Sequence, residues 1–134
     1  MSVLAVADSH AVLWYLYADA RLSAVARAFM HSAVADRMSI AVSSISLVEV
    51  AYLVEKGRVP QTAFEDLSSA LMDPEQVFVE VPVSMSVCDS LRKVSRDEVP
   101  DMPDRIIAAT GLYYNVPILS RDRRIQTAKL TTIW

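Results

Sequence analysis

The chain has 134 residues, of which 53% are hydrophobic, and a formal net charge of −3 at pH 7. This length is typical of one domain with its own core, so we expect a single domain over residues 1–134. The acidic balance argues against a general polyanion binder, and no stretch reaches the roughly 18 consecutive apolar residues of a membrane span.

Short apolar blocks separated by polar residues predict strands that alternate with helices. The expected strands cover 3–7, 39–42, 76–81, 116–119 and 131–133, and the expected helices cover 11–18, 23–36, 45–56, 61–71, 84–95 and 102–114. Gly57 stands where a helix ends in a left-handed residue. The alternation predicts an α/β fold with a largely parallel sheet covered on both faces. In open sheets of this kind, ligands bind outside the carboxyl ends of the strands.

The amino-terminal residues lack the basic region and long apolar stretch of a signal peptide. Cys88 is the single cysteine, which excludes an internal disulfide and fits a reducing compartment. We therefore expect a cytoplasmic protein without a membrane anchor, and we expect Cys88 to lie in the core.

Four acidic residues stand at positions where a parallel α/β fold gathers its chemistry. Asp8 follows the first expected strand, where it could also cap a helix, although Ser9 could cap that helix instead. Glu49 has no cation one turn away on its helix, so we expect it in a polar pocket at the core boundary.

The other two acids have stronger local explanations. Asp104 and Asp101 open a helix that carries Pro103 in its first turn, and the helix dipole favours acids there. Asp122 lies three residues after a strand in a charged segment that could be a solvated turn. Each is a weak signal alone, and the four together form a pattern.

A cluster of these acids needs a cation. Like charges brought together raise one another's pKa values unless a positive ion lies among them. Oxygen ligands without a paired His or Cys favour Mg²⁺ or Mn²⁺ over zinc. Asp8, Glu49, Asp104 and Asp122 are thus the candidate metal ligands and catalytic residues.

Four motifs, in order, resemble those of the PIN domain family, and most closely those of the VapC toxins of bacterial toxin–antitoxin pairs. They read VADSHAVLWYL, SSISLVEVAYLVEKG, DMPDRIIAAT and VPILSRDRRIQ. The resemblance implies an α/β/α sandwich with a central, mainly parallel sheet. It also implies a metal-dependent endoribonuclease that acts on RNA, leaves 5′-phosphate and 3′-hydroxyl ends, and forms a homodimer bound by a cognate antitoxin protein.

The family's acidic positions fall on Asp8, Glu49, Asp104 and Asp122. By the same resemblance, Asp101 matches a further acid before the helix, and Ser120 matches a hydroxyl residue that supports a carboxylate or a metal-bound water. The pair Met102-Pro103 departs from the family's more usual Pro-aromatic pair.

Cations near the acids are candidates for contacts with the substrate. Arg121, Arg123 and Arg124 could contact RNA phosphates, although a solvated turn explains each of them equally well. We expect Arg105 to make a structural ion pair near the acids.

Two other functions remain open. A phosphotransferase of the haloacid-dehalogenase type also has an Asp after its first strand, but it needs a second Asp two residues later, where this chain has His10. A non-catalytic interaction module could use the acidic pocket to receive a basic partner segment. Metal binding that depends on the acids would distinguish the enzyme from the module.

Overall fold

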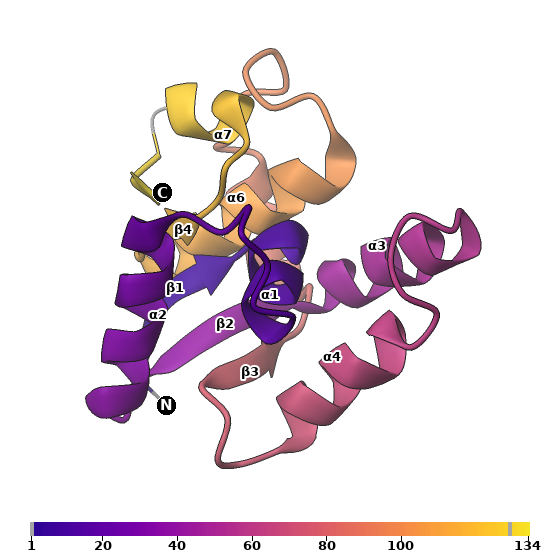
Figure 1. Ribbon diagram of the computed structural model, residues 1–134. Coiled ribbons are helices and arrows are strands. Elements are labelled where there is room, and N and C mark those ends of the chain that lie inside the picture. The colour runs from indigo at the N-terminus through magenta and orange to yellow at the C-terminus, as the bar shows by residue number, and fades with distance from the viewer. Residues whose placement is uncertain (1, 129) are drawn as a thin grey trace.

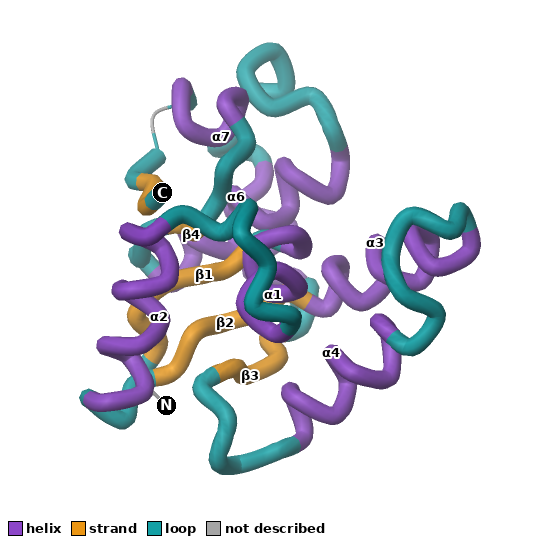
Figure 2. Tube along the Cα trace, viewed as in Figure 1, coloured by secondary structure: helices purple, strands orange, loops and turns teal. Residues whose placement is uncertain are grey.

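In the computed structural model, which describes residues 2–128 and 130–134, a sheet of five strands runs through the middle of the molecule (Figures 1 and 2). The strand order is β3-β2-β1-β4-β5, and every neighbouring pair is parallel. The strands are β1 (Val3–Ala7), β2 (Ser39–Ser43), β3 (Phe78–Val81), β4 (Ile118–Leu119) and β5 (Thr132–Ile133). The expected parallel sheet is therefore confirmed.

Helices cover both faces of this sheet. They are α1 (Ser9–Leu16), α2 (Ala24–Ala35), α3 (Ser44–Glu55), α4 (Ala63–Met72), α5 (Met85–Leu91), α6 (Met102–Tyr114) and α7 (Arg123–Thr127). Figure 1 shows α3 and α4 side by side, extending away from the sheet. The result is the expected α/β/α sandwich.

Alternation along the strands divides the core into two layers. Ala5 and Ala7 of β1 pack with residues of α1, α2 and α4, whereas Val6 between them packs with residues of α5, α6 and α7. Strand β2 repeats the pattern, with Ile40 and Val42 in the first layer and Ala41 in the second. The central strands are apolar on both sides because both sides are covered.

Several predicted boundaries move by one to four residues, and local capping explains the main differences. Helix α1 begins at Ser9 rather than at residue 11, because Asp8 is its N-cap and accepts the Ala11 N–H at 2.8 Å. Helix α7 was not predicted; it is one turn long and is capped by Asp122, whose Oδ1 accepts the Arg124 N–H at 2.8 Å. Helix α5 ends at Leu91, four residues before its predicted end.

The predicted end of α3 is confirmed in detail. Gly57 has a φ of 67°, its N–H donates to Val54 O, and the Arg58 N–H donates to Leu53 O. This pair of bonds is a Schellman ending, which favours glycine at the left-handed position. The expectation for Cys88 is wrong, because this residue of α5 is exposed.

No helix within residues 2–128 and 130–134 is long and apolar enough to cross a membrane.

Candidate functional site

A cavity of about 370 Å³ opens at the carboxyl edge of the sheet, beside the ends of β1 and β4. Acidic, cationic, aromatic and hydroxyl side chains line it together: Asp8, Ser9, His10, Trp14, Arg21, Glu49, Asp101, Asp104, Arg121 and Asp122. The structure thus brings all four predicted acids, and Asp101, to one cavity. It does so because parallel strands end on the same side and α3 and α6 begin there.

Asp8 lies at the base of this cavity and has two roles. It is 8% exposed, and its Oδ1 caps α1 through the Ala11 N–H. Burial raises the pKa of Asp8, and hydrogen bonds from Ser120 and Ala11 oppose part of that rise. Of the two residues that could cap α1, Asp8 is the cap, and Ser9 is not.

Ser9 instead supports Glu49. Its buried hydroxyl lies 2.6 Å from Glu49 Oε1, to which it donates, and 2.9 Å from Ser46 Oγ. This contact joins α1 to α3 across 40 residues of sequence and fixes the rotamer of Glu49. Glu49 is partly buried, as expected for a carboxylate in a polar pocket, and burial is the main cause of its raised pKa.

Asp104 and Asp122 meet across the cavity. Burial raises the pKa of Asp104 to about 8, and a hydrogen bond to Asp122 and the charges of Asp101, Asp122 and Glu49 add to the rise. Such a bond between two carboxyl groups requires a proton on one of them. The cluster therefore retains a proton near neutral pH when no cation is present.

Asp101 occupies the N-cap position of α6, yet its side chain makes no capping hydrogen bond. A capping hydrogen bond therefore does not account for its carboxylate, although the helix dipole still favours an acid at this end of α6. Asp101 is exposed and lines the cavity.

Ser120 is fully buried between two of the acids. Its Oγ accepts the Asp122 N–H at 3.0 Å, and its side chain also hydrogen-bonds Asp8. Its carbonyl accepts from Gln126 Nε2 at 3.0 Å, which ties the segment to α7. Ser120 is placed to position carboxylates, which is the supporting role that the resemblance implied.

The arginines separate into different places. Of the three proposed to contact RNA, Arg121 lines the cavity, whereas Arg123 and Arg124 lie on α7 and do not line it. The expectation of an ion pair for Arg105 is wrong. Its guanidinium donates to the carbonyls of Leu91, the last residue of α5, at 3.3 Å and of Val94, just after this helix, at 3.0 Å.

The chemistry of the donors fits a hard divalent cation. Five carboxylates line the cavity, and the Asp104–Asp122 contact holds a proton that a cation could replace. Within residues 2–128 and 130–134, no three His, Cys, Asp or Glu side chains form a ready-made ligand group. Mg²⁺ usually keeps several waters and takes only one or two carboxylates, so the arrangement suits Mg²⁺ or Mn²⁺ better than zinc.

Four residues of the site were not identified from the sequence. Ser9, Trp14 and Arg21 line the cavity, and Ser46 is hydrogen-bonded to Ser9. Ser9 was considered only as a helix cap, and the sequence carries no local signal for a bond to a residue 40 positions away. Arg21 lies in the segment between α1 and α2, far in sequence from every acid of the cavity except Asp8.

The chain is thus an α/β/α sandwich with an acidic cavity at the carboxyl edge of its parallel sheet. The sequence profile described as PIN domain matches residues 5–130, and the chain belongs to the PIN domain family. This assignment leaves the dehalogenase-type phosphotransferase without support.

Two relatives show what the chain resembles. Ribonuclease VapC22 of Mycobacterium tuberculosis (strain ATCC 25618 / H37Rv) is 30% identical over an alignment of 131 residues, and the match covers 95% of each chain. A chain in the crystal structure of VapBC2 from Rickettsia felis, bound to a DNA fragment from their promoter, aligns with a TM-score of 0.69. That alignment covers 98% of this chain and 97% of the other at 15% identity, so it shows the shared fold alone.

Proposed function

We propose that this chain is a Mg²⁺- or Mn²⁺-dependent endoribonuclease and the toxin of a toxin–antitoxin pair. The observation that carries the proposal is the convergence of Asp8, Glu49, Asp104 and Asp122 on one cavity. Likeness to a protein named ribonuclease over almost the whole chain supports RNA as the substrate. The proposed place of action is the cytoplasm.

The chain's own residues would bind and orient the reacting groups. Asp8, Glu49, Asp104 and Asp122 would hold the ion, with Asp101 at the rim of the cavity. Ser9 would hold the Glu49 side chain in its rotamer, and Ser120 would hold Asp8 and Asp122 in their positions relative to each other. When bound, Mg²⁺ or Mn²⁺ would supply charge neutralisation at the phosphate and a water of lowered pKa.

The test is cleavage of structured RNAs by the purified full chain, free of any antitoxin, in Mg²⁺ or Mn²⁺. We expect products with 5′-phosphate and 3′-hydroxyl ends, and no cleavage in excess EDTA or by Asp8→Asn. Asn caps helices about as well as Asp, so this variant should keep α1. Cleavage that persists in Asp8→Asn or in EDTA would contradict the assigned site.

Helix α3 offers a matched pair of variants. Glu49→Gln alters a cavity acid, whereas Glu55→Gln alters an exposed acid at the end of the same helix. We expect cleavage to fall at least 100-fold in the first and to stay unchanged in the second.

Calorimetric titration with Mg²⁺ distinguishes an enzyme from a non-catalytic interaction module. The enzyme should show a divalent-ion site in the wild type that is lost in Asp104→Asn. A module that uses its acids only to receive a basic partner segment should show no ion binding that depends on the acids.

We also propose a cognate antitoxin as protein partner and a homodimer as the assembly. The structural neighbour from a VapBC2 complex supports the first, and the resemblance to VapC toxins supports both. Sedimentation of the purified chain, alone and after co-expression with the antitoxin, measures each assembly directly.

A further inference from the structure

One wall of the acidic cavity is cationic. The guanidinium carbons of Arg21 and Arg121 lie 5.0 Å and 4.6 Å from the ring centroid of Trp14. Trp14 is 6% exposed, both arginines are exposed, and all three line the cavity together with the acids. The residues come from α1, from the segment after α1 and from the segment after β4, so the fold assembles this group.

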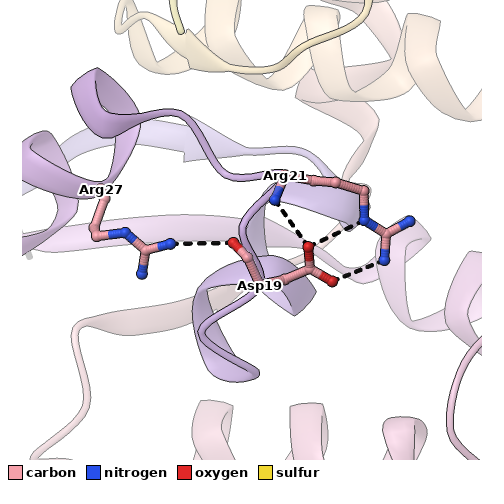
Figure 3. A network of polar contacts seen from close by, with 3 residues as sticks. All are labelled: Asp19, Arg21 and Arg27. Carbon is pink, nitrogen blue, oxygen red and sulfur yellow. Dashed lines mark hydrogen bonds and ion pairs between the residues drawn. The ribbon is translucent and has the colours of Figure 1, made fainter.

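Asp19 fixes the orientation of Arg21 (Figure 3). Its Oδ1 accepts from the Arg21 backbone N–H at 2.9 Å and from Nε at 3.1 Å, and its Oδ2 accepts from Nη2 at 2.8 Å. Arg27 Nη2 donates to the Asp19 carbonyl at 3.1 Å and holds the same segment from the side of α2. In the contacts that the described residues make, Arg21 Nη1 is left for a ligand.

Helix α1 ends beside this group in a left-handed residue. Ala18 has a φ of 51°, which a residue other than glycine rarely adopts. The Asp19 N–H donates to Trp14 O at 2.8 Å, so the turn brings Asp19 and Arg21 back beside Trp14. The Ala18 N–H donates to Tyr15 O at 3.2 Å, so α1 ends in the same Schellman arrangement as α3.

Covering Trp14 does not by itself explain two arginines. Two guanidinium groups on one indole repel each other, and an apolar side chain would cover the ring without that repulsion. Guanidinium groups are, however, the preferred partners of phosphate, which they bind with two parallel hydrogen bonds. A chain with a net charge of −3 also needs local cations to approach a polyanion.

We propose that Arg21 and Arg121, stacked on Trp14, bind backbone phosphates of the RNA strand beside the bond that is cleaved. Asp19 is a positioning residue that holds Arg21 in place. The inference rests on the proposed RNA substrate and goes beyond it by naming where the flanking phosphates bind. Arg123 and Arg124 on α7 are not part of this site.

The first experiment measures binding without cleavage. A labelled single-stranded oligoribonucleotide is titrated with the full-length Asp8→Asn chain from 50 to 200 mM salt, and gels check that the probe stays intact. Adding Arg21→Ala or Arg121→Ala should weaken binding about tenfold. Each should also reduce the slope of log affinity against log salt by about 0.7, the value for one phosphate contact on a single strand.

Two further variants serve as controls. Arg92→Ala removes an exposed arginine from an Asp–Arg pair on α5 that does not line the cavity, and it should bind the probe like its parent. Arg21→Lys keeps the charge but loses the paired donors, so it should keep the salt slope and lose part of the affinity. Circular dichroism of each variant confirms the fold.

Wild-type affinity and salt slope in both Arg21→Ala and Arg121→Ala would overturn the inference, and so would an equal loss in Arg92→Ala. A different result would contradict the proposed function. If the wild-type chain binds the probe through these arginines but cleaves no RNA, the phosphate site stands and the assigned catalysis is wrong. In an active chain, the same two variants should raise KM for RNA more than they lower kcat.

Discussion

Asp8 accepts the Ala11 N–H with Oδ1 and still lines the cavity, so capping a helix does not remove this carboxylate from the proposed site. Asp122 shows the same combination at the start of α7. At both positions the cap fixes the direction of the side chain, because one oxygen is held by the backbone. Local explanations for these acids, which compete with a site when the sequence is read alone, instead help to build it.

Ser9→Ala removes the hydroxyl that donates to Glu49 while the chain keeps its fold. Contacts that orient metal-binding residues are typically worth 10- to 100-fold in affinity or activity. We expect at least a tenfold loss of Mg²⁺ affinity by calorimetry. Ser32→Ala, which removes an exposed hydroxyl bonded to the Phe29 carbonyl on α2, should have no such effect.

The raised pKa of Asp104 predicts how the stability of the metal-free chain depends on pH. The carboxyl binds its proton more tightly in the folded chain, with a pKa of about 8, than in the unfolded chain, near 3.8. Its stabilising contribution is therefore present below about pH 4 and is lost as the pH rises through 8. Urea unfolding in EDTA should show stability that falls from about pH 5 to about pH 8 and levels off above it.

Asp104→Asn is the control for this dependence, because it cannot ionise. Its stability should change less between about pH 5 and about pH 8 than that of the wild type. Parallel curves for the two proteins would show that another group causes the decline.

At the scale of secondary-structure elements, helix α6 and strand β4 pack closely against each other. Each of these two elements positions one acid of the cavity. Gly111 of α6 has no side chain where it faces Ile118 of β4; a Cβ there would lie 2.8 Å from Ile118 Cγ1 and 3.3 Å from the Val116 carbonyl oxygen. Asp104 is in the first turn of the same helix, and Asp122 follows the same strand. The distance between these two acids thus depends on this contact.

Gly111→Ala should destabilise the chain although alanine is the better helix former. The gain in helix propensity is at most about 1 kcal/mol, whereas overpacking typically costs about 1–3 kcal/mol. We expect a net loss of up to about 2 kcal/mol in the free energy of unfolding, measured with urea. The cost should shrink in an Ile118→Ala background, and an undiminished cost there would exclude the Ile118 contact as its cause.

For the whole molecule, the sheet order places acids from distant parts of the chain on one edge. Strand β1 lies between β2 and β4, so Asp8 is central, with α3 following β2 on one side and Asp122 following β4 on the other. This arrangement concentrates negative charge that opposes the folded state when no cation is present. A bound divalent ion should therefore stabilise the entire fold.

Mg²⁺ should raise the melting temperature, and the rise should be larger at pH 8.5 than at pH 6, where protons compete for the carboxylates. Differential scanning fluorimetry with Mg²⁺ or EDTA measures both effects. Glu55→Gln should respond like the wild type and Glu49→Gln should not. An equal response in these two variants would place the ion elsewhere.

Most of the helices and strands follow from local sequence patterns. Short apolar runs rich in β-branched residues, such as Val3–Ala7, favour buried strands between two helical layers, and Ser23 and Gly57 mark helix ends through local backbone chemistry. Alternation of strands and helices then favoured the parallel sheet. The short helix α7 escaped prediction because a single turn with charged residues carries no apolar periodicity.

Which side chains meet depends on the three-dimensional arrangement of the elements. The contacts of Ser9 with Glu49, of Asp104 with Asp122, and of the two arginines with Trp14 join residues that no local pattern relates. The order of strands in the sheet determines which of these side chains come into contact. The apolar periodicity along the chain does not encode that order. The four acids could therefore be named from the sequence, whereas the cationic wall that faces them could not.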